Sequence, residues 1–132
     1  MLIKEIRARV IKDSRNEETI EVSIDGTGVA SAPSGKSTGK YETPPYHKKG
    51  LKFNIDFLNN WHDTCAINLF DDLMLIEEII VKKLKLGDVK GFGGNALFAF
   101  ESAILKALAS EQKKALWEII NPRAKKFPRP VG

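Results

Sequence analysis

The spacing of hydrophobic residues changes once along the chain, from that of a β-strand to that of an α-helix. Polar and apolar residues alternate without a break over residues 19–25, which is typical of a strand with one buried face. The same alternation predicts a strand from Ile3 to Lys12 and a short one from Val29 to Ala32. Turn residues at 13–17 and 25–28 separate the three strands and predict an antiparallel meander.

The part of the chain after residue 50 has helical spacing instead. It predicts a helix from Phe57 to Cys65, a second over 69–84, a third over 95–109, and a last helix over 116–120 that Ser110 caps. Strands followed by helices indicate an α+β domain, with a three-stranded antiparallel meander and about four helices packed on one face. The 132 residues, 42% of them hydrophobic, suit one folded unit.

Composition argues against several classes of protein. No apolar run approaches the roughly 18 residues of a membrane span, and residues 1–5 lack the layout of a signal peptide, so we expect a cytoplasmic protein with no membrane partner. Cys65 is the single cysteine, and we predict a small buried or half-buried apolar residue rather than a reactive thiol. The net charge is +4, but the basic residues are scattered and lack interleaved aromatic residues, so nucleic acid is not an expected partner.

Residues 33–50 are rich in Gly, Ser, Thr, Lys and Pro, and Pro44-Pro45 suits neither a helix interior nor a central strand. A loop this long in a compact domain is usually functional or disordered. Residues 30–38 also fit a relaxed phosphate-binding P-loop, with alanine in place of the first glycine. A P-loop needs a helix directly after it to hold the phosphates. Residues 38–45 cannot form one, so we do not expect nucleotide binding.

Four segments resemble enolases in their order and spacing. Residues 32–42 resemble the enolase mobile loop, in which a proline precedes Ser-Gly-Ala-Ser-Thr-Gly and a glutamate follows. Residues 13–22 resemble the enolase opening, Asp-Ser-Arg-Gly-Asn-Pro-Thr-Val-Glu-Val. Residues 92–97 resemble the Leu-Gly-Ala-Asn-Ala-Ile that begins a long buried helix, and 127–132 resemble the segment leading into the enolase barrel. Together these segments span nearly the whole chain.

The resemblance implies the amino-terminal (lid) domain of an enolase over residues 1–122, and a linker over 123–132 toward a (β/α)8 barrel. Enolases are carbon–oxygen lyases of glycolysis that dehydrate 2-phosphoglycerate to phosphoenolpyruvate with Mg²⁺. In the family, the lysine base, the glutamate acid and the acidic ligands of the first Mg²⁺ belong to the barrel. The chain is therefore expected to be inactive alone and to need a barrel, in the same longer chain or as a separate subunit, and to form a homodimer only with that barrel.

The resemblance also implies which residues serve the site. Ser37 occupies the position whose hydroxyl and carbonyl oxygens bind the second Mg²⁺ once barrel and substrate are present. The flanking glycines let the backbone swing and approach a ligand, and closure of the loop excludes water. The implied substrate loop consists of Ser34, Gly35, Lys36, Ser37, Thr38 and Gly39.

Outside the loop, Arg9, Arg15 and Glu21 match positions that support the enolase domain or its dimer contact; ordinary exposed strand charges are the alternative reading.

The chain departs from the enolase pattern at several positions. Lys36 replaces an alanine and either contacts the phosphate or points to solvent. Asn16 replaces a turn glycine, a mild change because asparagine tolerates left-handed backbone. Glu101 lies within an otherwise apolar helix, so we expect a basic partner or an edge position. These departures indicate a divergent, archaeal-type enolase or an enolase-like paralogue; the alternative function is a stand-alone binding module for a protein or RNA partner.

Overall fold

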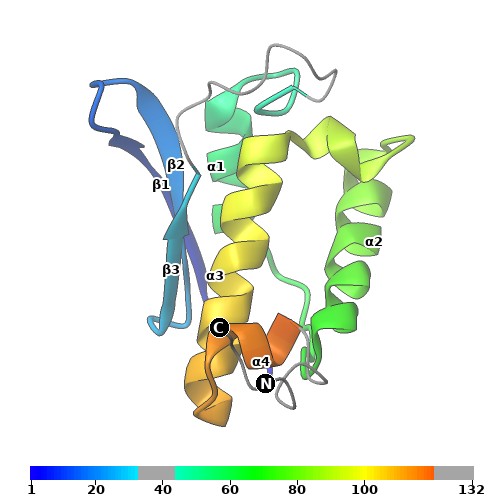
Figure 1. Ribbon diagram of the computed structural model, residues 1–132. Helices are drawn as coiled ribbons and strands as arrows, with labels where there is room; N and C mark the ends of the chain where they lie inside the picture. The colour runs from blue at the N-terminus through cyan, green and yellow to red at the C-terminus, as the bar shows by residue number, and fades with distance from the viewer. Residues whose placement is uncertain (33–43, 121–132) are drawn as a thin grey trace, which may run out of the picture.

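The computed structural model describes residues 1–32 and 44–120, which form a three-stranded sheet with helices on one face (Figure 1). Strands β1 (Ile6–Lys12), β2 (Glu18–Ile24) and β3 (Gly28–Ser31) are antiparallel in the order β1-β2-β3. Val22 at the centre of β2 lies between Ala8 of β1 and Ala30 of β3, and all three are buried. The predicted meander is confirmed, and its buried face is continuous across the three strands.

Four α-helices follow the sheet within the described residues, so the α+β fold is also confirmed. Helix α1 contacts β1, and α3 contacts β2 and β3. Helix α2 lies on the far side of α3 from the sheet (Figure 1). None of the helices in the described parts of the chain is both long and apolar enough to cross a membrane. The helical elements are α1 (Leu51–Asn59), the 3-10 helix η2 (Phe70–Asp72), α2 (Leu73–Leu84), the 3-10 helix η3 (Val89–Phe92), α3 (Gly94–Gln112) and α4 (Leu116–Ile120).

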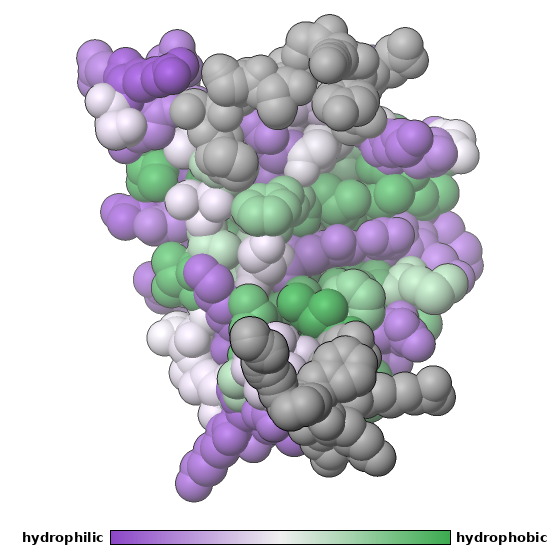
Figure 2. Space-filling view, viewed as in Figure 1, coloured by the Kyte–Doolittle hydropathy of each residue, from purple (hydrophilic) through white to green (hydrophobic). Residues whose placement is uncertain are grey.

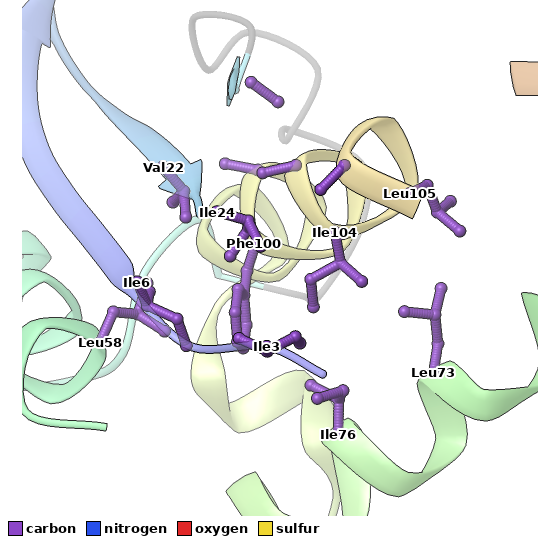
Figure 3. Close-up of a cluster of buried hydrophobic side chains, with 14 of the residues drawn as sticks. Ile3, Ile6, Val22, Ile24, Leu58, Leu73, Ile76, Phe100, Ile104 and Leu105 are labelled. Atoms are coloured by element: carbon purple, nitrogen blue, oxygen red, sulfur yellow. The ribbon is translucent and has the colours of Figure 1, made fainter. Parts of the chain in front are cut away.

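Helix α3 is buried around most of its circumference because it lies between the sheet and α2. Phe100 points toward Ile3 and Ile6 in the layer nearest the sheet, whereas Leu105 points toward Leu73 of α2 (Figure 3). One hydrophobic core therefore joins the sheet to both helical layers. The buried residues of α3 are Ala96, Ala99, Phe100, Ala103, Ile104, Leu105, Ala107, Leu108 and Ala109.

Strand β3 crosses α3 in backbone contact at Gly28. A Cβ atom on Gly28 would lie 2.1 Å from the carbonyl oxygen of Ala103 and 2.5 Å from the backbone nitrogen of Ala107. Both atoms belong to the helix backbone, so no change of side-chain rotamer could make room. Glycine on the strand and alanine on the helix therefore set the distance between sheet and helix.

The predicted boundaries of the first helix and the first strand are wrong. Helix α1 ends at Asn59 and does not reach Cys65. Residues 64–67 are extended and pair with the beginning of the chain, where the amide of Ile3 donates to the carbonyl oxygen of Cys65 at 3.1 Å. Strand β1 begins only at Ile6, and the amides of Lys4 and Glu5 before it donate to Oδ1 of Asp25. Cys65 is buried, as predicted, but its segment alternates between buried and exposed residues, which is the spacing of a strand and not of the predicted helix.

The predicted cap of the last helix is also wrong. Ser110 lies inside α3, which continues to Gln112. Lys113 then adopts left-handed backbone with φ 56° and ends the helix. Helix α4 begins only at Leu116, so residues 113–115 form the connection.

We predict that Gly28→Ala lowers the free energy of unfolding by about 1–3 kcal/mol, because the added methyl group overpacks a rigid backbone contact. Gly87→Ala is the matched control, since a Cβ there meets nothing within 4 Å; it should be neutral or stabilise by up to about 1 kcal/mol. Urea unfolding of both variants measures the difference. Equal midpoints would contradict the close approach of β3 to α3.

Candidate functional site

The predicted substrate loop, Ser34 to Gly39 with Ser37 in it, lies outside the described residues. The chain is described on both sides of this loop, up to Ala32 and again from Pro44. The structure therefore describes the residues beside the two ends of this loop. We define the loop base as Thr19, Ala32 and residues 44–47.

Thr19 holds the two sides of the loop base together. It lies on β2 and its side chain is only 2% exposed. The Thr19 hydroxyl donates to the carbonyl oxygen of Ala32 at 3.1 Å, and its oxygen lies 3.1 Å from the Tyr46 hydroxyl oxygen. A threonine hydroxyl can donate one hydrogen bond and accept another, so it donates to Ala32 and accepts from Tyr46. One buried side chain thus fixes residues on both sides of the loop.

The exit side of the loop base caps helix α3. The carbonyl oxygen of Pro44 accepts from the amide of Gly94 at 2.7 Å, and that of Pro45 accepts from the amide of Asn95 at 2.9 Å. Amides in the first turn of a helix have no partner within the helix. The proline carbonyls satisfy them, so the position of residues 44–45 is tied to the beginning of α3.

Gly93 allows this approach. It has φ 105°, a conformation that favours glycine, and a Cβ there would lie 2.3 Å from the Cα of Tyr46. The segment 92–97, which resembles an enolase motif, therefore has a specific role. Its glycine lets the loop base contact the start of α3 through backbone atoms.

Asn54 of α1 binds His47, the remaining residue of the loop base. Its Oδ1 accepts from the amide of His47 at 3.0 Å, and its Nδ2 donates to the carbonyl oxygen of Phe92 at 2.8 Å. Asn54 is fully buried, and a buried amide without partners would be costly. The Asn54 amide therefore joins α1, the loop base and the turn before α3.

His47 is fixed in this network by its amide, its ring nitrogen and the face of its ring. Burial lowers the pKa of His47, and the positive charges of Lys49 and Lys48 lower it further, so the imidazole is neutral at pH 7. Its Nδ1 accepts from the amide of Lys49 at 3.0 Å. The ring stacks on Phe53 with centroids 4.1 Å apart, which fixes its orientation.

A family model described as the N-terminal domain of enolase matches residues 3–120. The chain belongs to this family. It is 28% identical over 135 residues to the enolase of Thermoplasma acidophilum, with 98% of this chain and 33% of that protein covered. It is 30% identical over 139 residues to the enolase of Methanothermobacter thermautotrophicus, with 99% and 33% covered. The chain spans about a third of the length of these enolases.

Two of the three charged residues predicted for an enolase domain or dimer contact lie together. Arg9 on β1 faces Glu21 on β2, with Nε and Oε1 2.6 Å apart. The Arg9 side chain is 71% exposed, and an exposed ion pair of this kind contributes at most about 1 kcal/mol to stability.

Arg15 lies in the β1–β2 turn, where its amide donates to Oδ1 of Asp13 at 2.8 Å. Asn16 there has φ 64°, the left-handed backbone that the sequence allowed for.

No group of three or more His, Cys, Asp or Glu side chains within residues 1–32 and 44–120 is placed to hold a metal ion. Ser37, the residue predicted to contact the second Mg²⁺, lies outside these ranges.

The residues that fix the loop base are not among those predicted from the sequence. Thr19 is predicted only as part of a strand, although it lies within residues 13–22, which resemble the enolase opening. Asn54 stands four residues before Leu58 and shares the buried face of α1, so a polar residue at an apolar position was an available signal. Tyr46 gave no such signal, because its partner is 27 residues away in the sequence.

Glu101 was expected to have a basic partner or to lie at an edge; its neighbour is acidic and the residue is half-buried. Its carboxyl group on α3 lies beside that of Glu77 on α2, and its Oε2 is buried without a hydrogen-bond partner among the described residues. Burial raises the pKa of Glu101 to about 9, with further contributions from the hydrogen bond to Glu77 and its charge. Glu101 is therefore protonated at neutral pH.

We predict that the stability of the chain falls as the pH rises from about 4.5 to about 9. Folded Glu101 keeps its proton up to about pH 9, whereas the unfolded chain releases it above the ordinary pKa of 4.5. The unfolded state then binds fewer protons, so the free energy of unfolding decreases by at most about 1.4 kcal/mol per pH unit. Urea unfolding between these pH values should show a shallower slope for Glu101→Gln, and an unchanged slope for the exposed control Glu78→Gln. Parallel slopes for Glu101→Gln and the unmodified chain would refute the assignment.

We predict that Thr19→Val lowers the free energy of unfolding by about 1–2 kcal/mol, because it removes both hydroxyl contacts of a buried site. Tyr46→Phe should cost less in the presence of Thr19→Val than alone, since the two hydroxyls share one contact. Thr64→Val, at an exposed position, is the control. Strictly additive effects in this double-mutant cycle would show that the two sides of the loop base are not linked.

Proposed function

We propose that this chain is the lid domain of an enolase, a cytoplasmic glycolytic enzyme that dehydrates 2-phosphoglycerate to phosphoenolpyruvate. The proposal rests on the family match over residues 3–120, together with relatives about three times as long. A (β/α)8 barrel would supply the catalytic base, the catalytic acid and most metal ligands. It would belong to the same longer chain or to a separate subunit.

The loop base supports a lid role for Ser34 to Gly39. A loop that closes on substrate must place its tip reproducibly, which requires fixed ends. Thr19 links Ala32 to Tyr46, and the carbonyl oxygen of Pro44 binds the start of α3. These contacts hold both ends of the segment at one place on the domain.

Within the loop we assign one metal ligand. Ser37 would offer its hydroxyl and carbonyl oxygens to the second Mg²⁺ after barrel and substrate are in place. When bound, Mg²⁺ stabilises negative charge that develops on the substrate. Gly35 and Gly39 would give the backbone freedom beside this residue, and Lys36 would add a positive charge near the phosphate or in solvent.

The exposed charges on the sheet fit a second contact. We assign Arg9, Glu21 and Arg15 to the contact with a neighbouring barrel or subunit, with dimerisation only when a barrel is present. The Arg9 side chain is 71% exposed although it pairs with Glu21. The guanidinium group has five N–H donors, so it can also bind a carboxylate on a partner.

The test is a chimera in which this chain replaces the first third of the Methanothermobacter thermautotrophicus enolase. We expect the chain alone to leave 2-phosphoglycerate unchanged and the chimera to produce phosphoenolpyruvate. In the chimera, Ser37→Ala should raise the Mg²⁺ concentration for half-maximal activity by about 10–100-fold, as losses near a metal site commonly do. Ser31→Ala, at an exposed position before the loop, should have no effect. A folded but inactive chimera would instead favour a stand-alone binding module for a protein or RNA partner.

A further inference from the structure

The two open edges of the sheet are each bound by one side chain from a helix. Strand β1 forms one edge and β3 the other. At the β1 edge, Nδ2 of Asn59 donates to the carbonyl oxygen of Ala8 at 3.0 Å, and Oδ1 of Asn59 accepts from the Ala8 amide at 2.8 Å. At the β3 edge, Nζ of Lys106 donates to the carbonyl oxygen of Val29 at 3.3 Å. An open edge presents unpaired backbone groups that can bind another strand, so each contact leaves fewer such groups available.

Asn59, the last residue of α1, binds β1 as a neighbouring strand would. A side-chain amide has the same kinds of donor and acceptor as a peptide group, and here both engage Ala8. Because the amide and the carbonyl group of Ala8 both reach Asn59, they point away from β2. Backbone groups two residues apart on an antiparallel strand point the same way, so those of Ile6 and Val10 also point outward. In the part of the chain that the structure describes, Ala8 is the one residue of β1 whose backbone binds a side chain.

The second half of β1 extends beyond the hydrophobic core. Ile6 and Ala8 are buried, whereas Val10 on the same face is 42% exposed and Lys12 is exposed. The β1–β2 turn that follows lies away from the helices (Figure 1), and its surface at the top left of Figure 2 is hydrophilic. Another strand could therefore reach the edge at Val10 from solvent. It would be held by backbone hydrogen bonds rather than by an apolar patch.

The arginines of β1 favour one register for pairing with a second copy of the strand. Two copies can pair antiparallel about a two-fold axis, with the central residue of each strand opposite itself. A pairing centred on Arg7 or Arg9 places that arginine opposite its copy, and one centred on Ala8 places Arg7 opposite Arg9, which is destabilising for like charges. Centres nearer the ends of β1 pair fewer of its residues. A pairing centred on Val10 avoids both problems, because Arg9 then lies opposite Ile11.

We propose that Asn59 closes the β1 edge of this domain, and that without it β1 pairs antiparallel with β1 of a second copy, centred on Val10. In that register Ala8 lies opposite Lys12 of the other copy, and the pairing needs both outward groups of Ala8. Asn59 occupies these two groups. Strand β3 is a poorer edge for pairing, because it has four residues against seven in β1 and Lys106 binds one of its carbonyl groups.

Sedimentation equilibrium of Asn59→Ala and of the unmodified chain tests the proposal. Asn59→Ala should lower the dissociation constant of the dimer by about 10–100-fold, because pairing no longer has to break the hydrogen bonds between Ala8 and Asn59. Asn60→Ala is the matched control. It removes a contact at the end of α1, to the carbonyl oxygen of Asp56, and should leave the dissociation constant unchanged. A folded Asn59→Ala chain that associates no more than the unmodified chain would overturn the proposal.

Two substitutions of Val10 distinguish strand pairing from other association. Combined with Asn59→Ala, Val10→Pro should restore the monomer, because proline has no amide and the Val10 amide points away from β2. Val10→Thr keeps that amide and should leave the dimer intact. Association that survives Val10→Pro would assign the dimer to another surface and overturn the pairing of β1.

Hydrogen exchange of the unmodified chain tests the closed edge directly. The Ala8 amide, which binds Asn59, should exchange more slowly than the Val10 amide, which points to solvent. Should Asn59→Ala fail to fold, Asn59→Asp is the second variant. Its carboxylate can accept from the Ala8 amide but cannot donate to the Ala8 carbonyl group, so the dissociation constant should fall by less than with Asn59→Ala. Equal exchange at Ala8 and Val10, or a folded Asn59→Asp chain with unchanged association, would overturn the proposal.

Discussion

The backbone contact between β3 and α3 sets the geometry of the rest of the domain. Gly28 brings the strand against the carbonyl oxygen of Ala103 and the amide nitrogen of Ala107, atoms that cannot move without disturbing the helix. With α3 held at this distance, its first turn faces Pro44 and Pro45 and its opposite side faces α2. Both the loop base and the neighbouring carboxyl groups of Glu77 and Glu101 follow from where this one helix lies.

The loop base shows how a rigid core can support a functional segment. Thr19 comes from the sheet, Asn54 from α1, and the capped amides from α3. These three elements also contribute to the hydrophobic core. Because the core is rigid, it holds the polar contacts of the loop base in place. The buried amide of Asn54 and the buried hydroxyl of Thr19 carry no chemistry themselves. They fix the frame from which a reactive segment can act.

Much of the fold could be predicted from the sequence where one period dominates locally. The alternation from Thr19 to Asp25 predicted β2, and the tolerance of asparagine for left-handed backbone explained Asn16 in its turn. Prediction failed where distant residues decide the structure. Cys65 is extended because the beginning of the chain pairs with its segment. Glu101 lies beside Glu77 because α2 packs on α3, and Tyr46 reaches Thr19 across the loop. Helical spacing and local composition do not depend on such long-range pairings, so they cannot predict them.

The central position of α3 has a consequence for synthesis of the protein. The strands are made first, but the helix that covers β2 and β3 begins only at Gly94. Until it leaves the ribosome, the buried face of the sheet has no cover apart from α1. Contacts between residues this far apart in sequence form slowly, and exposed strands invite association with other chains in the meantime. The late arrival of α3 therefore leaves the apolar face of the sheet largely uncovered until the helix that begins at Gly94 has been synthesised.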